Sequence, residues 1–437
     1  MSLKTNLFKM TSLSVVDTIV LKILATLSFA IVTHLLPLEH IGIIGVATGY
    51  LVFFRLLSVT PESILYRDMP KIKDRLSEYI SAFMIFWAIK TIVIMAIAAA
   101  ASYIVYLIYG NQLISIYFFG SVFVLSLGIF HGIAKETLYM SFKQGIATKV
   151  SAALMILTLG LTSLLFFSPS IISYLYISMA ANLISAGVWT YFIKKSLNLK
   201  FKKTKDTFKI IKNSITDFAL WTHIGACISN LLLTADVLVL SFFVALSVIG
   251  DYTIALTIAN FFFILPMMLQ KASTVGLSNM DDKKTVEKTI SVLLKYSFIL
   301  SALQFLAFLV FGKLIIAIFT ANNINIIYSY ALLILAGNSI INVFRPMLGI
   351  VITKINISKH VIYIFLPAAI MGVISYIILT ILYGPIGAAA GNIVTSSILS
   401  ALLIVVVKRE YKLKVSFQLL SAEEKGLIKS ILSRLGI

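Results

Sequence analysis

The sequence predicts an all-α integral membrane protein with about twelve transmembrane helices. Three observations carry this prediction. Hydrophobic residues make up 60% of the 437 residues, and the mean hydropathy is +1.02. Apolar runs of about 20 residues, long enough to cross a bilayer as a helix, recur from Val15 to Val407. Nearly all Lys and Arg residues fall in every second gap between these runs.

The charge and cysteine content exclude several other classes of protein. Only 12% of residues are charged, about half of the share in a soluble domain. The formal net charge of +19 sits beside apolar runs, where anionic lipid headgroups and topology explain it, and no folded domain remains to bind nucleic acid. The single Cys227 excludes an intramolecular disulfide. The first apolar run lacks a cleavage site, so we expect it to be retained as a span.

Each apolar run is assigned to one span, in chain order. The predicted spans are 13–35, 41–63, 78–107, 113–134, 148–167, 171–193, 216–245, 249–270, 291–319, 326–345, 360–382 and 386–407. Six gaps contain no Lys or Arg, at 36–40, 109–112, 168–170, 247–250, 321–325 and 383–387. They are short, so the spans that flank them form tight helical hairpins.

The distribution of charge over the remaining gaps predicts a topology. These gaps hold Arg67 to Arg75, Lys135 to Lys149, Lys194 to Lys212, Lys271 to Lys295, Arg345 to Lys359, and a tail from Lys408 to Arg434. Cytoplasmic loops of membrane proteins carry an excess of Lys and Arg. We therefore expect these gaps and both termini to be cytoplasmic.

The longest interruption divides the spans into two sets of six. It is the basic segment 194–212, KKSLNLKFKKTKDTFKIIK. We expect an N-terminal six-helix bundle at 1–193, a basic cytoplasmic linker at 194–215, a C-terminal six-helix bundle at 216–407 and a cytoplasmic tail at 408–437. A solvated linker that fixes topology is the simplest interpretation of the segment. The alternative is contact of Phe201, Phe208 and Ile210 with the inner leaflet.

The two halves carry a weak internal repeat. Four features of the first half recur in the second at a constant offset: Ile41-Gly42 as Ile249-Gly250, Ala47 as Ala255, Phe53-Phe54 as Phe261-Phe262, and Leu57 as Leu265. Because six spans is an even number, both halves have the same orientation in the membrane. This indicates parallel repeats related by an axis along the membrane normal. In a transporter, such repeats form two bundles around a central cavity.

Four basic residues lie inside predicted spans, where an ionisable side chain is costly unless it faces a cavity or a partner. Lys22, Arg55 and Lys90 lie on consecutive spans of the first half and predict a cationic pocket open towards the cytoplasm. Arg binds phosphate with two hydrogen bonds and Lys as a point charge, so the expected ligand is phosphate or diphosphate. The alternative is separate snorkelling of each side chain. Lys313, near the outer end of span nine, is a candidate for an outer cavity or for snorkelling outward.

Three acidic residues are candidates for ion coupling or for the cavity. Asp17 and Glu62 are close to the cytoplasmic ends of spans one and two, where they can pair with Lys22 or Arg55. Asp236 lies deeper, in the outward half of span seven. A buried carboxylate can carry a proton or coordinate Na⁺. The alternative is a hydrogen-bonded structural Asp beside Thr234.

The sequence contains no catalytic motif. It has no P-loop, no Gly-x-Ser-x-Gly and no Asp-rich metal motif. We therefore expect a transporter rather than an enzyme, with no metal centre and no cofactor. Transport would be driven by an H⁺ or Na⁺ gradient, by the membrane potential or by the substrate gradient.

Three short motifs occur in order along the chain. Residues 35–42, LLPLEHIG, contain a Pro-Leu-Glu turn after the first span. Asp236 and Leu240 are followed by Val248-Ile249-Gly250-Asp251-Tyr252 and Ala255, and residues 384–389, GPIGAA, open the last span. These motifs resemble those of the Wzx-type O-antigen and polysaccharide flippases, which belong with the MATE drug exporters and the lipid II flippases to the MOP exporter superfamily. The first motif departs from the family pattern at Leu36, where Gly is usual.

The resemblance implies a MATE-like or lipid II flippase-like fold with a cytoplasm-facing cationic cavity, in a bacterial inner membrane. It implies translocation of undecaprenyl-diphosphate-linked oligosaccharide, such as O-antigen repeat units of lipopolysaccharide biosynthesis, to the periplasmic leaflet. Membrane lipids, a polysaccharide polymerase and chain-length machinery are the candidate partners. Asp236 and the turn at 250–252 are family features, whereas Lys22, Arg55 and Lys90 rest on charge placement alone.

Two alternative functions stay open on the sequence. A cation-coupled multidrug exporter of the same fold favours cationic drugs and should place carboxylates in its cavity, whereas the deep residues here are net basic. A membrane polysaccharide polymerase or glycosyltransferase usually carries a long outward loop with polar catalytic groups, and every outward gap here is short.

Overall fold

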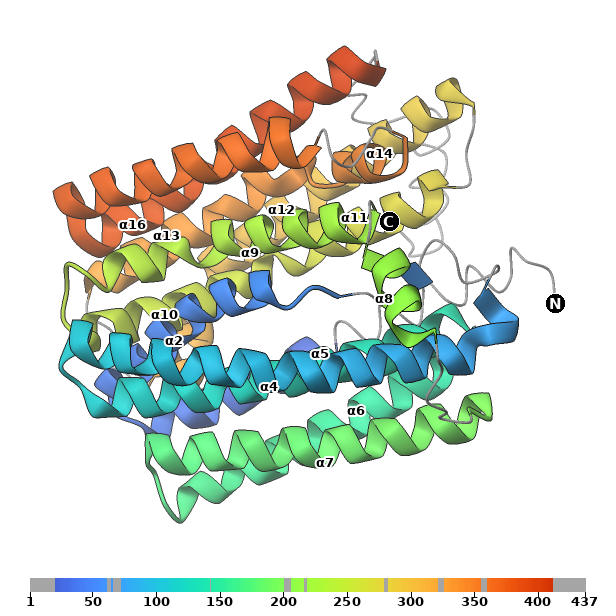
Figure 1. The fold of residues 1–437 in the computed structure, drawn as a ribbon. Helices are drawn as coiled ribbons and strands as arrows, with labels where there is room; N and C mark the ends of the chain where they lie inside the picture. The colour runs from blue at the N-terminus through green and yellow to red at the C-terminus, as the bar shows by residue number, and fades with distance from the viewer. Residues whose placement is uncertain are drawn as a thin grey trace, which may run out of the picture.

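The computed structural model describes residues 20–60, 64–65, 72–141, 143–199, 206–215, 218–278, 282–320, 326–354 and 360–411. Within these ranges every regular element is a helix, and most of the long helices run roughly side by side (Figure 1). The all-α fold predicted from hydropathy is confirmed.

The first half forms six helices that match the first six predicted spans. They are Val20–Leu35, α2 (Leu38–Leu57), α4 (Leu76–Tyr109, preceded by η2, Lys73–Arg75), α5 (Gln112–Met140), α6 (Gln144–Thr162, continued by η3, Ser163–Phe166) and α7 (Ile171–Leu197). Local turn chemistry separates them. Gly110 adopts a φ of 61° between α4 and α5, and the side chains of Asn111 and Ser170 cap α5 and α7.

The second half begins with the short helix α8 (Thr207–Ile215), which packs against α4 and α9. It continues with α9 (Phe218–Leu240), α10 (Leu246–Phe262), α11 (Ile264–Ser278), α12 (Lys283–Phe319), α13 (Ile326–Ile341), η4 (Asn342–Phe344), α14 (Met347–Lys354), η5 (Val361–Phe365) and α16 (Leu366–Tyr411). Gly384, with φ 56° and ψ −134°, breaks α16 into two helices. Close contacts of Gly372 with Thr395 and of Gly391 with Tyr376 show that these two helices are antiparallel.

Among the described residues, seven helices are long and apolar enough to cross a membrane, or eight if the bent α9 counts as one span. Three shorter apolar helices, Val20–Leu35, Leu246–Phe261 and Leu332–Phe344, lie where spans one, eight and ten were predicted. Together with the two antiparallel parts of α16, these helices account for the twelve predicted segments. The chain is therefore a multi-pass membrane protein.

The turn between α9 and α10 lies elsewhere than predicted. It occupies 241–245, SFFVA, rather than 247–250, so Gly250 and Tyr252 are inside α10 and not in a turn. This turn is apolar and contains neither Gly nor Pro, which are the residues that mark turns in a sequence. The hydrophobic run therefore gave no sign of where the helix ends.

The gap predicted after span ten also differs from the expectation. Helix α14 occupies part of it, and its apolar residues Met347, Leu348, Ile350 and Val351 are buried in the core of the second half. Arg345, expected in this cytoplasmic gap, is only 7% exposed.

The two halves meet where α2 packs against α10, and the repeat-related glycines lie at this contact. A Cβ atom on Gly42 would lie 2.0 Å from the carbonyl oxygen of Leu246, and one on Gly250 would lie 2.0 Å from that of Leu38. The offset that relates the two halves interchanges these two contacts, as parallel repeats around a pseudo-twofold axis require. Only glycine lets two helix backbones approach this closely.

We name the two ends of the molecule by their loops. The hairpin end carries the turns 36–37, 110–111, 167–170 and 241–245, and the basic end carries Arg75 and α8; they lie left and right in Figure 1. At the hairpin end, Tyr109 Oη lies 2.7 Å from Ser241 Oγ and 3.2 Å from Tyr50 Oη. The two halves are therefore in contact at the hairpin end.

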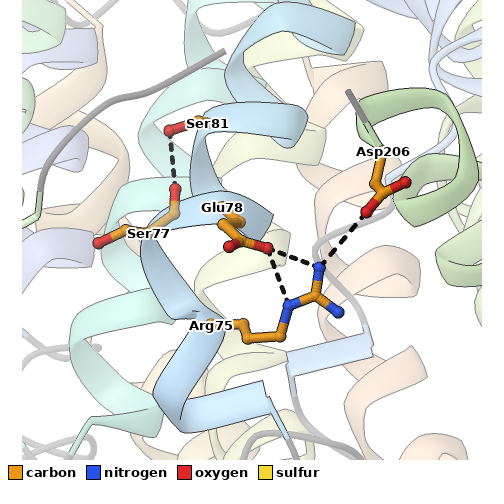
Figure 2. Close-up of polar contacts among 5 residues, drawn as sticks. All are labelled: Arg75, Ser77, Glu78, Ser81 and Asp206. Atoms are coloured by element: carbon orange, nitrogen blue, oxygen red, sulfur yellow. Dashed lines mark hydrogen bonds and ion pairs between the residues drawn. The ribbon is translucent and has the colours of Figure 1, made fainter. Parts of the chain in front are cut away.

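At the basic end, an ion-pair cluster connects α4 to the start of α8 (Figure 2). The Arg75 guanidinium donates to Glu78 Oε2 from Nε at 2.8 Å and from Nη2 at 2.6 Å, and Nη2 lies 3.9 Å from Asp206 Oδ2. All three side chains are exposed, so salt weakens these pairs. Helix α8 occupies part of the expected linker, where it buries Ile210 against the protein and leaves Phe208 exposed.

Candidate functional site

A cavity of about 660 Å³ lies between three helices of the first half and one helix of the second. The helices are α2, α5, α7 and α9. Ile44, Thr48, Leu51 and Arg55 line it from α2 at a spacing that places them on one helix face. From Ile44 to Arg55 the cavity extends about 16 Å along α2, at 1.5 Å per residue. Its size is that of a typical ligand pocket.

Arg55 brings positive charge to the basic end of this cavity. It lies in the last turn of α2, and its side chain is exposed there. His223 of α9 also lines the cavity, and its Nε2 lies 3.1 Å from the carbonyl oxygen of Leu56. Among the described lining residues, Arg55 and His223 are the only Lys, Arg, His, Asp or Glu.

Lys90 is hydrogen-bonded to a segment that lines the cavity. Its Nζ donates a 3.0 Å hydrogen bond to the carbonyl oxygen of Val59, which lies between the lining residues Ser58 and Thr60. Lys90 also interacts electrostatically with His223. The structure thus brings Lys90 to the same end of the cavity as Arg55. We call Arg55 and Lys90 the cationic rim; His223 lies beside it.

Two other predicted site residues, Lys22 and Lys313, are not part of this group. Lys22 is half-buried on the helix Val20–Leu35 and is not among the lining residues. Lys313 is exposed on α12 and does not line the cavity either. Asp17 and Glu62 lie outside the described residues.

Asp236 lies in the second half, apart from the cavity lining. Its side chain is fully buried. It accepts hydrogen bonds from Tyr252 Oη at 2.8 Å, from Asn392 Nδ2 at 3.1 Å and from the main-chain N–H of Val237 at 2.8 Å. Asp236 and Tyr252, both in the second sequence motif, are thus hydrogen-bonded to each other, and this bond connects α9 to α10.

A chain of amide side chains connects Asp236 to the buried Arg345. Asn392 Oδ1 accepts a hydrogen bond from Asn338 Nδ2. Asn342 Nδ2 donates to Asn338 Oδ1 at 3.2 Å, and Arg345 Nε donates to Asn342 Oδ1 at 3.0 Å. A buried charge needs such partners because its desolvation is costly. The network was not predicted from the sequence, where its only signal is a pair of asparagines one helical turn apart in an apolar span.

Sequence reasoning also missed the α9 side of the cavity. Thr222, His223, Cys227 and Asn230 line it at helical spacing. That spacing was visible in the sequence, but it does not show which helix α9 faces. Cys227 Sγ lies 3.5 Å from His223 Nε2, so this cysteine can serve as a chemical reporter next to the cationic rim.

Comparison with known proteins shows which solved structures share this fold. No protein-family model matches the sequence, and no curated protein matches it. Among solved structures, an inward-facing multidrug resistance MATE family transporter of the MOP superfamily matches with a TM-score of 0.69 and 14% identity, over 90% of this chain and 96% of that one. The lipid II flippase MurJ, in an inward closed conformation, matches with a TM-score of 0.66 and 16% identity, over 90% of this chain and 87% of that one. The eukaryotic MATE transporter AtDTX14 matches with a TM-score of 0.62 and 16% identity, over 92% and 95%. The chain therefore has the all-helical fold that these MATE transporters share with the lipid II flippase.

Proposed function

We propose that this protein is a flippase that moves an undecaprenyl-diphosphate-linked oligosaccharide, such as an O-antigen repeat unit, across the bacterial inner membrane by alternating access. The observation that carries the proposal is the cavity between the two halves, whose cationic rim contains Arg55 and Lys90, with His223 beside them. A diphosphate needs cations and hydrogen-bond donors, and a guanidinium supplies both in a planar fork. The polyprenyl tail is apolar and stays in the lipid.

The orientation follows from the positive-inside rule. It places the basic end and both termini in the cytoplasm, so that the cationic rim meets substrate at the cytoplasmic leaflet. The product is released at the hairpin end, where a polysaccharide polymerase and its chain-length machinery would receive it.

A cation-coupled multidrug exporter is the second candidate, because the fold is also that of MATE transporters. Such an exporter would bind cationic drugs with carboxylates. The described lining residues include no Asp or Glu. This charge pattern favours an anionic headgroup over a cationic drug.

Transport by the purified protein in proteoliposomes tests the choice between the two. The substrates are an undecaprenyl-diphosphate-linked saccharide and a cationic dye such as ethidium. A flippase should translocate the lipid-linked saccharide and leave the dye gradient unchanged. Movement of the dye without movement of the lipid would assign the protein to the drug exporters.

Asp236 is our candidate for ion coupling, with H⁺ or Na⁺ as the coupling ion. Asp236→Asn keeps the size of the side chain and can still accept from Tyr252, but it removes the only described carboxylate of the network around Asp236. We expect an imposed H⁺ or Na⁺ gradient to accelerate wild-type transport at least several-fold and to have no effect on Asp236→Asn.

The matched control for this prediction is Tyr252→Phe, which removes one hydrogen bond and leaves the carboxylate in place. It should retain most of the response to the gradient. An Asp236→Asn protein that still responds like the wild type would place the coupling ion elsewhere.

A further inference from the structure

The part of the cavity nearest the hairpin end contains two stacked tyrosines. Tyr117 of α5 and Tyr174 of α7 both line the cavity. Their ring centroids are 6.4 Å apart and their planes differ by 13°. Both residues lie within the first two turns of their helices counted from the hairpin end, whereas Arg55 lies in the last turn of α2 at the basic end.

Neutral polar side chains continue from the tyrosines towards the rim. Ser178 and Asn182 follow Tyr174 at four-residue spacing on one face of α7, Ser121 follows Tyr117 on α5, and Asn230 approaches from α9. No charged side chain is among these residues. The cavity thus changes in character along its length, from cationic at the basic end to aromatic and neutral at the hairpin end.

The two asparagines retain hydrogen-bonding capacity towards the cavity. Asn182 Nδ2 donates to the carbonyl oxygen of Ser178 at 2.8 Å, and Asn230 Nδ2 donates to that of Ala226 at 2.9 Å. Each bond uses one N–H of the amide. Within the part of the chain that the structure describes, the second N–H and the carbonyl oxygen of each amide have no other hydrogen bond and can bind a ligand.

We propose that Tyr117, Ser121, Tyr174, Ser178, Asn182 and Asn230 form a saccharide subsite, which we call the tyrosine chamber; this inference rests on the proposed function. A sugar ring has an apolar C–H face and a rim of hydroxyl groups. Aromatic rings bind the face, and amides and hydroxyls bind the rim. The cationic rim holds the diphosphate at the basic end, so the first sugars that follow it extend into the tyrosine chamber.

Ligand protection of Cys227 tests this subsite in the full-length protein. The cysteine lines the cavity beside Arg55 and His223, so a bound headgroup should slow its reaction with a small methanethiosulfonate reagent. The probes are bare undecaprenyl diphosphate and the same lipid carrying N-acetylglucosamine or galactose. For the wild type we expect at least one glycosylated lipid to protect Cys227 at roughly threefold to tenfold lower concentration than the bare lipid.

The variants separate the saccharide contact from the diphosphate contact. Tyr174→Leu should remove the advantage of the glycosylated lipid and leave protection by the bare lipid unchanged, which also shows that the variant is folded. Tyr174→Phe keeps the ring and should retain most of the advantage, and Asn182→Ala should reduce it.

Two results would overturn the subsite while leaving the flippase proposal in place. One is equal protection of the wild type by bare and glycosylated lipids. The other is an unchanged advantage in Tyr174→Leu. If no lipid protects Cys227 at all, the proposed function itself fails.

Discussion

Replacing Arg55 by Gln should reduce transport of an undecaprenyl-diphosphate-linked saccharide by about 10- to 100-fold. The Arg55 side chain is exposed to the cavity in the last turn of α2. It supplies charge-assisted hydrogen bonds to the diphosphate, and each such bond contributes about 1.5–3 kcal/mol. Initial rates in proteoliposomes, together with the amount of folded protein, measure the effect.

Arg55→Lys separates charge from geometry. It keeps the positive charge but loses the planar fork, so we expect a rate between those of the wild type and Arg55→Gln. Lys313→Gln removes one charge from an exposed position of α12 and is the matched control, with unchanged transport. Wild-type transport by Arg55→Gln would show that the cationic rim does not hold the headgroup.

Replacing Gly250 by Ala should open the contact between the two halves at the hairpin end. The new Cβ atom would lie 2.0 Å from the carbonyl oxygen of Leu38, so α2 and α10 must move apart. Overpacking of this kind costs about 1–3 kcal/mol, which shifts a two-state equilibrium by about 5- to 150-fold. A membrane-impermeant thiol reagent added from the hairpin side should then label Cys227, whereas we expect no labelling from that side in the wild type.

Because the two halves are repeats, the same experiment can be done at Gly42, the equivalent of Gly250. Gly42→Ala places its Cβ atom equally close to Leu246 and should have the same effect. Gly160→Ala is the matched control, because no heavy atom lies within 4 Å of the added methyl group. Labelling of Cys227 from the hairpin side that is equal in Gly250→Ala, Gly160→Ala and the wild type would exclude a role of the glycine contact in closing this end.

Hydropathy predicted the helices well because it depends only on local composition. Hydropathy misplaced a turn where the residues that mark turns, Gly and Pro, were absent. The turn at 241–245 is as apolar as the helices on either side of it, with Phe242 and Phe243 exposed at the hairpin end. Arg345 was assigned to a loop because a basic residue at the end of an apolar run usually lies there. Its burial depends on Asn342, whose role is visible only once α13 and α16 are packed together.

The candidate site was accessible to sequence reasoning only in part. An arginine inside a span is costly in lipid, so Arg55 could be found from its position alone. Tyr117, Tyr174 and Asn230 carry no such signal, since Tyr and Asn occur widely in spans as packing and hydrogen-bonding residues. These residues come together only because α5, α7 and α9 line one cavity. Hydrophobic periodicity does not show which helices are neighbours, so the sequence could not predict this group.

The contact between Gly42 and Gly250 has the form of an isologous interface within a single chain. Leu38 touches Gly250 in the way that Leu246 touches Gly42, as in a twofold dimer of two six-span units. In such a dimer one substitution would alter both contacts at once. In the single chain the two contacts are formed by different residues, so a substitution in one half leaves the sequence of the other half unchanged. That separation lets the first half carry Arg55 and Lys90 while the second half carries the network around Asp236.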